Sequence, residues 1–421
     1  MVKKKSGIPR REVTKRQLSR WQKQKRRQRI VFGSGIFIIV AVLGTIGAGW
    51  YITQYQPLHQ TVIVVNDTEF DMNYYIKMLK YYGEGQPIQY MQFMADTVAK
   101  DIEQNELVRQ GAMKLGISVS SDEVDEKLKS YDPPLSKDYR DIVGAQMLFD
   151  KLRDEYFDKQ VPVFAEQRHI MAMLLESESQ AAEVRARLEG DEDFAELAGE
   201  LSLESFSKTE QGDLGWQLKG FLTRLLNTSV PDEHAFSSEV GVLSQPIYDE
   251  TKAKNVGYWL IKVIEGDEVA QQALVQVILL GSEEEAQDIR DRLEAGEDFA
   301  TLAKEFSQHD LSRENEGNLN VESPDMMSPA FSEFVFDPEV ELETISELIR
   351  DDAVATTGGY WLLKVVDMDD NRQIADEDRD LLKTDALSEW VSSLWDDPGN
   401  KIENYLDDDK KAWAIAKAIG G

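Results

Sequence analysis

The sequence predicts an α+β protein with one N-terminal transmembrane helix, a helical domain, two tandem α+β domains and a C-terminal helical segment. Three observations predict this organisation. Residues 30–52 form an uncharged apolar run, a block of about 100 residues occurs twice, and the segments flanking the repeats have helical periodicity. A chain of 421 residues is long enough for several domains, each with its own core.

Charge is distributed unevenly along the chain. The net charge is -31, but residues 1–29 hold 13 basic side chains and one acid, Glu12, so this tail has a net charge of +12. The remainder is strongly acidic, which argues against nucleic-acid binding, because phosphate contacts need a basic face. The chain contains no cysteine, which excludes disulfides and thiolate chemistry. Its four histidines are scattered, so we expect neither a metal nor a cofactor.

The apolar run at residues 30–52 predicts a membrane span. At the rise of an α-helix it is about 34 Å long, enough to cross the hydrocarbon core. The basic residues 1–29 predict a cytoplasmic N-terminus, which places the main body outside the cytoplasm. The basic flank would also contact anionic lipid. The alternative is a cleaved signal peptide, although the apolar run is long for one and no A-x-A site follows it.

A duplication follows the first 160 residues. Ala181–Ser202 and Ala286–Ser307 are identical at 13 of 22 positions at a constant offset of 105. Both copies end in nearly the same strand, GYWLIKV at 257–263 and GYWLLKV at 359–365. We therefore predict two domains of similar fold, at 166–266 and 272–369.

The landmarks of each copy resemble the parvulin family of peptidyl-prolyl isomerases. They are the helix EGDEDFAELAGELS or EAGEDFATLAKEFS, the turn GDLG at Gly212–Gly215, and the closing strand GYWL(I/L)KV. The resemblance implies a parvulin-like α+β fold and membership of the peptidyl-prolyl cis-trans isomerase family. Whether either copy is an active enzyme stays open at this point.

Residues 60–165 resemble the helical N-terminal domain of SurA- and PrsA-like foldases. The matching segments are TVIVVNDTEF at 61–70 and the run VAKDIEQNELVRQGAMKLGISVSSDEVDEKL at 98–128. Asp71 and either Ser120 or Ser121 are placed to cap helices. In such foldases a C-terminal helix packs back on this domain. The resemblance implies the same for residues 374–421, which hold an amphipathic helix at Asp376–Leu394.

The resemblance places one catalytic histidine on the first strand and one on the last. Here the first-strand positions hold Ala172 and Val277, and the last-strand positions hold Trp259 and Trp361. His169 lies three residues before Ala172, so strand alternation places it on the opposite face unless an insertion shifts the register.

The third catalytic position of the family, a Cys or Asp, corresponds to Glu204 in the first copy and to His309, followed by Asp310, in the second. The candidate catalytic residues are therefore His169 and Glu204. The alternative is that Glu204, His309 and Asp310 belong to a solvated loop.

The family binds the proline ring in an apolar seat. The resemblance assigns this role to Leu214, Leu222 and Leu226 in the first copy and to Leu319, Met327 and Phe331 in the second. Trp259 and Trp361, which replace the last-strand histidine, would add to the apolar peptide-binding face. The alternative is that these side chains form ordinary core, with the two tryptophans as core plugs.

The function expected from these observations is that of a membrane-anchored extracytoplasmic foldase or chaperone that binds unfolded secreted polypeptides. Its isomerase activity would be weak or lost, because the polar catalytic positions are substituted. One alternative is an active peptidyl-prolyl isomerase that works through the first copy. A second is a non-catalytic scaffold in the cell envelope. The expected partners are polypeptide clients and, through Ile30–Ile52, the membrane; the oligomeric state stays open.

Overall fold

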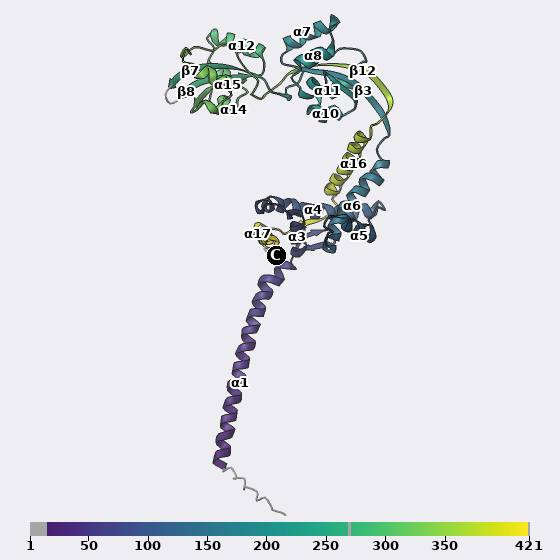
Figure 1. Cartoon of the computed structure of the whole chain (residues 1–421), viewed down its shortest axis with the longest axis vertical. Coiled ribbons are helices and arrows are strands. Elements are labelled where there is room, and N and C mark those ends of the chain that lie inside the picture. Colours follow the sequence, from purple (N-terminus) through teal and green to yellow (C-terminus); the bar gives the residue numbers. More distant parts are fainter. Residues whose placement is uncertain (1–14, 268–270, 420–421) are drawn as a thin grey trace, which may run out of the picture. The chain divides into compact units, whose positions relative to one another are not determined.

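The computed structural model describes residues 15–267 and 271–419, which form two compact units (Figure 1). Unit 1 comprises the chain up to Val161 together with the segment from Asp376 onward, and unit 2 comprises Pro162–Ala375. Residues 1–14, the first half of the basic tail, lie outside the described residues.

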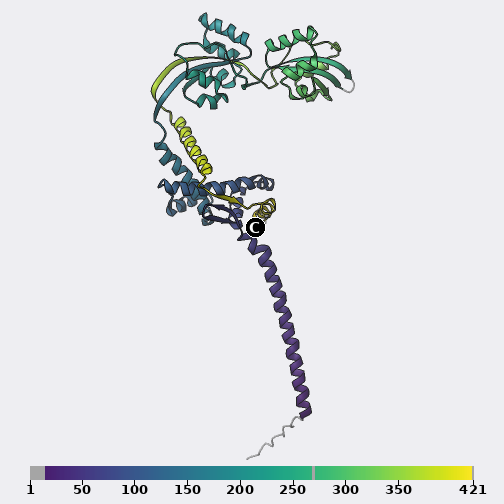
Figure 2. The ribbon, with the colours of Figure 1, turned by 180° about the vertical axis from the view of Figure 1, so that it is seen from behind.

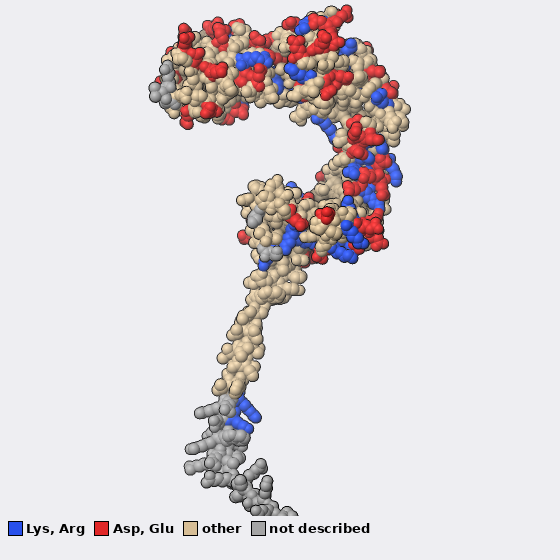
Figure 3. Space-filling view, viewed as in Figure 1, with Lys and Arg blue, Asp and Glu red and all other residues tan. Residues whose placement is uncertain are grey.

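Unit 1 begins with a long apolar helix. Helix α1 spans Lys15–Trp50 and continues through the π-helical turn η1 (Tyr51–Tyr55) into α2 (Gln56–Leu58). The stretch Val31–Leu58 has the length and hydropathy needed to cross a membrane, and its most apolar 18-residue window contains no buried residue, a pattern that a signal sequence shares. It is the tan rod in Figure 3, without a charged side chain.

The helical body of unit 1 is built on a small sheet. Strands β1 (Thr61–Val65) and β2 (Thr68–Asp71) form a hairpin, and α3 (Met72–Gly83), α4 (Ile88–Lys114), α5 (Ser121–Ser130) and α6 (Arg140–Lys151) follow. The short helical turns η2 (Lys137–Tyr139), η3 (Leu152–Tyr156) and η4 (Phe157–Lys159) flank α6.

Side-chain caps fix where two of these helices begin. The carboxylate of Asp71 accepts a hydrogen bond from the N–H of Tyr74 at 2.9 Å, and Ser120 forms a reciprocal capping box with Glu123. Both helices therefore begin where the sequence predicts, with Ser120 rather than Ser121 as the cap of α5.

The C-terminal segment returns to unit 1, as the resemblance implied. It contains α16 (Asp376–Asp396), β13 (Ile402–Asn404) and α17 (Asp408–Ile419). Strand β13 pairs antiparallel with β1, and α17 buries Ala414 in the core formed by β1, α3 and α4. The sequence predicted α16 and a helical segment over 374–421, in which α17 lies, but it did not predict the strand β13.

Unit 2 contains two domains of similar topology. Domain A has the sheet order β4-β3-β12-β5, with β3 at Phe164–Leu175, β4 at Asp213–Leu218, β5 at Ile247–Tyr248 and β12 at Tyr360–Gln373. Its helices are α7 (Glu178–Glu189), α8 (Phe194–Leu201), α9 (Ser205–Thr209), α10 (Phe221–Leu226) and α11 (Val230–Ala235).

Domain B repeats this arrangement with the order β10-β7-β8-β9. Its strands are β7 (Gly257–Asp267), β8 (Gln272–Leu280), β9 (Asn318–Val321) and β10 (Ile349–Asp351). Its helices are α12 (Glu283–Glu294), α13 (Phe299–Phe306), α14 (Asp310–Glu314), the 3-10 turn η5 (Pro324–Met326) and α15 (Pro329–Val335).

The two domains exchange their closing strands. Strand β3 of the first copy pairs with β12, which closes the second copy, in a register that sets Met171 opposite Lys364. Strand β8 of the second copy pairs with β7, which closes the first copy, and Gln276 lies opposite Lys262. Figure 2 shows β3 and β12 running together along their whole length. Domain B is thus inserted between β5 and β12 of domain A.

The exchange differs from the predicted organisation, in which 166–266 and 272–369 each close their own sheet. The chain crosses between the domains twice, and the crossing segments β6 (Ala253–Lys254) and β11 (Thr356–Thr357) pair antiparallel with each other. The closing strands are nearly identical, so either sheet can accept either strand. Sequence pattern alone therefore does not decide the pairing.

Candidate peptide-binding sites

Domain A has a buried tryptophan at the last-strand position where the parvulin resemblance places a histidine. The Trp361 side chain is fully buried, and its Nε1–H donates to Oδ2 of Asp249 at 3.0 Å. The same carboxylate accepts hydrogen bonds from the hydroxyls of Thr228 (2.7 Å) and Thr251 (2.8 Å). Burial by itself raises the pKa of Asp249, but the hydrogen bonds from Thr228, Trp361 and Thr251 outweigh it and lower that pKa.

The apolar residues assigned to the proline seat of domain A are core residues. Leu214, Leu222 and Leu226 are at most 4% exposed and belong to one buried cluster with Trp361. Their side chains fill the space under the sheet, so they offer no surface to a peptide. In domain A these three leucines are therefore part of the hydrophobic core, which was the alternative interpretation of their role.

Glu204 caps α9 and does not reach His169. Its carboxylate accepts a hydrogen bond from the N–H of Ser207 at 2.6 Å and lies 3.7 Å from Nζ of Lys252. Both ions are nearly buried, and the Lys252 ammonium also lies over the Trp361 ring at 5.8 Å. The carboxylate is therefore held in a structural cluster rather than in a solvated loop.

His169 belongs to a different cluster. Its Nε2 lies 2.7 Å from Oδ1 of Asp213, and its ring stacks on Trp216 at 5.6 Å. The neighbouring Ile170 and Ala172 are fully buried, and both belong to the core cluster that contains Trp361. Residues of odd number on β3 face the other way, as alternation requires. The two candidate catalytic side chains therefore share no partner.

Domain B repeats the buried tryptophan with a different neighbour. Trp259 is 1% exposed, and its Nε1–H donates to Oδ2 of Asp351 at 2.9 Å; Ser328 donates to the same oxygen. The indole packs edge-on against Phe331, with ring centroids 5.0 Å apart, and against His309 at 5.3 Å. Phe331 is fully buried, so the indole occupies the apolar seat to which Phe331 was assigned.

A shallow cavity of about 360 Å³ adjoins Trp259 in domain B. Its lining includes His309, Asp310 and the exposed Leu311. Burial lowers the pKa of the His309 imidazole, although the nearby Asp310 opposes this shift. Leu319 and Met327 pack half-buried against the core of this domain and do not line the cavity.

The partners of the two tryptophans were missed by the sequence analysis. Asp249 and Asp351 are related by the same offset of 102 residues as Trp259 and Trp361, so the repeat itself contained the signal. The pairing was not recognised in the sequence because of the strand exchange: each tryptophan donates a hydrogen bond to the aspartate of the other copy.

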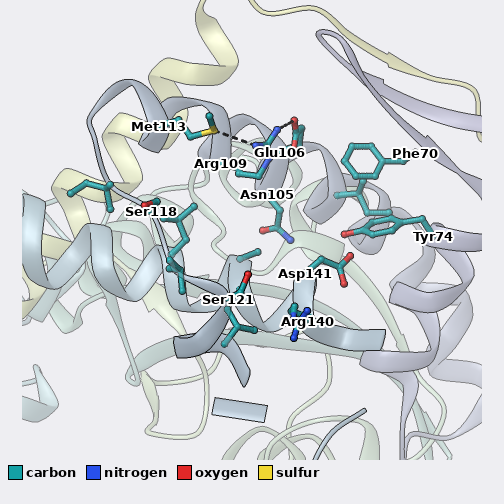
Figure 4. A pocket seen from close by; sticks show the side chains of 17 residues that line it. Phe70, Tyr74, Asn105, Glu106, Arg109, Met113, Ser118, Ser121, Arg140 and Asp141 are labelled. Atoms are coloured by element: carbon teal, nitrogen blue, oxygen red, sulfur yellow. Dashed lines mark hydrogen bonds and ion pairs between the residues drawn. The ribbon is translucent and has the colours of Figure 1, made fainter. Parts of the chain in front are cut away.

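A larger cavity lies in unit 1. The sequence predicted no individual candidate site residue in this unit. It measures about 490 Å³ and is bounded by α4, α5, α6 and the segment between α4 and α5 (Figure 4). Its floor is apolar and includes the buried Ile102, Val124 and Leu148. Phe70 and Tyr74 close one end.

The charged groups around this cavity are paired with one another. Glu106 accepts two hydrogen bonds from Arg109, at 2.6 and 2.7 Å. Arg140 binds Asp125, and Asp141 binds Lys77. Burial and the adjacent Asp141 raise the pKa of Tyr74, so its hydroxyl stays protonated. The cavity thus has an apolar floor and a rim whose ions are neutralised in pairs.

Comparison with known proteins agrees with the fold and the repeats. Residues 169–265 and 258–369 each match the PPIC-type PPIASE domain, that is, the parvulin type of peptidyl-prolyl isomerase. A protein named Chaperone SurA from Pseudomonas fluorescens is 35% identical over 167 residues, which cover 37% of each chain. A protein named Foldase protein PrsA from Halalkalibacterium halodurans is 37% identical over 100 residues, covering 24% of this chain and 28% of that one.

The chain thus matches about a third of the length of these relatives or less. A crystal structure of the peptidylprolyl isomerase PrsA from Bacillus anthracis covers 76% of this chain and 94% of its own, at 12% identity. The TM-score of this comparison is 0.29.

The fold and the two domain matches define the class: the chain contains two domains of the PPIC-type peptidyl-prolyl isomerase family. Together with the helical N-terminal unit and the returning C-terminal helix, they make it a SurA/PrsA-like chain with tandem parvulin domains.

Proposed function

We propose that this protein is a membrane-anchored extracytoplasmic foldase or chaperone that binds unfolded secreted polypeptides and has little or no isomerase activity. The observation that carries the proposal is the pair of buried tryptophans. In both domains an indole takes the place of the last-strand histidine, and its only polar atom is bound to a buried aspartate.

The physical reason lies in what the reaction needs. Rotation about an X–Pro bond crosses a barrier of about 18–20 kcal/mol without breaking a bond. A catalyst must therefore hold polar groups against the twisted amide. The N–H groups of Trp259 and Trp361 are already bonded, and the indole of Trp259 packs against Phe331 in the proline seat.

A protease-coupled assay with a proline-containing peptide tests the loss of activity. The full chain in detergent should leave the isomerisation rate close to the uncatalysed rate, and His169→Ala should change nothing. Turnover near that of a full parvulin, abolished by His169→Ala, would favour the alternative of an active first domain. That alternative draws on the His169–Asp213 contact of 2.7 Å and on the 28% exposure of the His169 side chain.

Client binding separates a chaperone from an envelope scaffold. The relatives' names, Chaperone SurA and Foldase protein PrsA, support the first. The full chain should suppress the aggregation of two unrelated unfolded proteins at stoichiometric concentration. Suppression of neither would favour a scaffold with one dedicated partner.

The membrane anchor is supported by the apolar helix Val31–Leu58 and the basic flank of residues 1–29. Protease added outside intact cells should digest the chain beyond residue 60 and spare the basic tail. A body protected inside the cytoplasm would contradict the proposed topology, and a mature chain that begins after residue 52 would favour a cleaved signal peptide.

A further inference from the structure

Domain B contains a complete site for one of its own arginines. Arg350 of β10 lies directly opposite Tyr258 of β7. Its guanidinium lies over the Tyr258 ring at 5.6 Å and donates to the Tyr258 hydroxyl at 2.6 Å and to the carboxylate of Glu176 at 3.2 Å. The carboxylate of Asp352 accepts another hydrogen bond from the same guanidinium at 3.0 Å. One tyrosine ring and two carboxylates therefore bind this guanidinium.

The equivalent position of domain A holds a tyrosine in place of the arginine. Tyr248 of β5 lies opposite Tyr360 of β12, and each is offset by 102 residues from its counterpart, Arg350 or Tyr258. The two rings pack with their centroids 5.1 Å apart. Tyr248 is 53% exposed, on the edge strand of the sheet. Within the part of the chain that the structure describes, neither hydroxyl forms a hydrogen bond.

The carboxylates around the two sites are related by the repeat. Glu176 corresponds to Gly281 at an offset of 105, so this carboxylate has no counterpart in domain A. Gln180 corresponds to Glu285 at the same offset, which supplies a carboxylate there instead. The two side chains are placed alike, because Gln180 accepts a hydrogen bond from the N–H of Glu176 at 2.9 Å and Glu285 accepts one from the N–H of Gly281 at 3.1 Å.

The carboxylates near the tyrosine pair have no cation bound to them. Those that act on the two hydroxyls include Glu178, Glu250, Glu284 and Glu285. Burial raises the pKa of both hydroxyls, and these negative charges raise it further. Across residues 15–267 and 271–419, no basic side chain lies within ion-pair distance of any of the four. The ammonium of Lys254 feels the charge of Glu285, but it is 4% exposed and donates to the backbone carbonyl of Glu176.

We propose that the Tyr248–Tyr360 pair and its carboxylates form a binding site for the guanidinium of an arginine side chain on a partner polypeptide. The inference deepens the proposed foldase function by naming a side chain that its clients present, and it rests on that function. A planar guanidinium stacks on an aromatic ring and donates several hydrogen bonds to carboxylates around it. Domain B fills its site with Arg350, and domain A leaves the equivalent site to a ligand.

This site lies on the other face of the sheet from the proline seat. Tyr360 and Trp361 are adjacent on β12, so their side chains point to opposite faces. Tyr360 packs against a cluster that includes Val184 of α7 and Leu197 of α8, whereas Trp361 belongs to the core with Leu222. An arginine side chain therefore reaches the tyrosine pair without entering the seat that the parvulin resemblance indicates.

The charge of unit 2 attracts cations to this site from a distance. Pro162–Ala375 holds 46 acidic and 16 basic side chains, a net charge of -30. Figure 3 shows acidic side chains over much of the visible face of this unit. Such a field raises the local concentration of any cation without selecting among cations. An experiment must therefore separate binding at the tyrosine pair from this general attraction.

The test uses the full chain in detergent at physiological ionic strength and calorimetric titration with a blocked peptide of Gly and Ser that carries three spaced arginines. Two matched peptides carry lysine or citrulline instead, and citrulline keeps the shape of arginine without its charge. Tyr248→Arg copies Arg350 and supplies the site with a guanidinium from the chain itself. Glu285→Gln removes one carboxylate from the site.

Glu333→Gln is the control for general attraction. It changes the net charge of unit 2 by the same amount as Glu285→Gln or Tyr248→Arg. Glu333 is exposed and lies on α15, which packs through Phe331 on the side of Trp259 rather than on the side of the tyrosines.

We expect Tyr248→Arg to weaken binding of the arginine peptide at least tenfold, because the chain's own guanidinium occupies the site. Glu285→Gln should weaken it about threefold, on the scale of one exposed ion pair. Glu333→Gln should leave it unchanged. The citrulline peptide should bind at least tenfold more weakly than the arginine peptide, and the lysine peptide should lie between them because an ammonium does not stack as a planar group. The melting temperature of each variant checks that it is folded, and Glu285→Gln keeps the test valid if Tyr248→Arg is not.

Each other outcome overturns the inference or part of it. Unchanged binding by a folded Tyr248→Arg would exclude the tyrosine pair. Equal losses in Glu285→Gln and Glu333→Gln would reduce the effect to the general charge of unit 2. Equal binding of the lysine peptide would overturn the selection of a guanidinium. If the unmodified chain suppresses aggregation but does not distinguish arginine from citrulline, the site is wrong and the chaperone function stands. If it does neither, the proposed function fails as well.

Discussion

The indole N–H of Trp259 donates to the carboxylate of Asp351 at 2.9 Å, although 92 residues separate them in the sequence. Its counterpart joins Trp361 to Asp249 across 112 residues at 3.0 Å. Each bond exists because the closing strands β7 and β12 are exchanged, so that each tryptophan completes the sheet of the other copy. The tryptophans that replace the last-strand histidines of the family are therefore held by hydrogen bonds that depend on the strand exchange.

Removing either aspartate should destabilise unit 2. Asp249→Ala or Asp351→Ala leaves a buried indole N–H without an acceptor, which costs about 1–3 kcal/mol. Asn at the same position retains a carbonyl oxygen and is the control. The free energy of unfolding in urea, followed by tryptophan fluorescence, measures the difference. Equal stability of the Ala and Asn variants would contradict a structural role for these bonds.

The strand exchange can be mapped with cysteine pairs, because the chain has no cysteine of its own. Directly opposed residues of an antiparallel pair lie within disulfide range. A double variant with Cys at 171 and 364 should cross-link on mild oxidation, since Met171 lies opposite Lys364. A variant with Cys at 171 and 262 should not. The reverse result would mean that each copy closes its own sheet.

The free energy of unfolding should fall in mild acid because His309 binds a proton more readily in the unfolded chain than in the folded one. Nδ1 of this residue accepts a hydrogen bond from the N–H of Ser312 at 3.3 Å, at the start of α14, and a protonated ring loses that acceptor. Burial lowers the pKa of His309, so the unfolded chain takes up the proton at higher pH than the folded chain. Unfolding is therefore favoured as the pH drops below the usual histidine value of about 6.5.

The measurement for this prediction compares the unmodified chain with His309→Asn, which keeps a capping side chain but does not titrate in this range. The free energy of unfolding of the variant should depend less on pH between 7.5 and 5. Burial also lowers the pKa of His234 in domain A. The pH dependence of the free energy of unfolding of His234→Asn therefore shows how much a second buried histidine contributes. Identical pH slopes for the unmodified chain and His309→Asn would rule out this contribution.

The glycines that begin the turns before β4 and β9 should not tolerate a side chain. Gly212 and Gly317 have φ angles of 83° and 87°. A Cβ on Gly212 would lie 2.8 Å from the Ala198 Cβ, and one on Gly317 would lie 3.0 Å from the Phe299 ring. The left-handed backbone alone costs about 1–2 kcal/mol for a residue with a Cβ.

Gly241→Ala provides the control for that prediction, because Gly241 has a φ of 82° but open space around it. Gly212→Ala and Gly317→Ala should lower the melting temperature more than Gly241→Ala does. The difference measures the steric conflict with α8 and α13 separately from the backbone strain. Equal losses at all three positions would mean that the helices move aside without cost.

Much of this architecture could be read from local sequence pattern. The uncharged run from residue 30, the caps at Asp71 and Ser120, and the duplicated helix–turn–strand block each depend on residues close together in the chain. Such features reflect hydropathy, periodicity and local hydrogen bonding, which a short window of sequence contains. The resemblance to parvulins rests on the same short motifs.

Tertiary structure alone decided the features that depend on distant partners. Two nearly identical closing strands make both pairings equally compatible with the sequence, and the choice between them depends on how the whole of unit 2 packs. The same holds for Glu204, whose carboxylate lies near the ammonium of Lys252 rather than near His169. Local sequence determined the helices and strands. The partners of these elements were determined by contacts between residues far apart in the chain, and those contacts depend on shape and on the cost of burying an unpaired polar group.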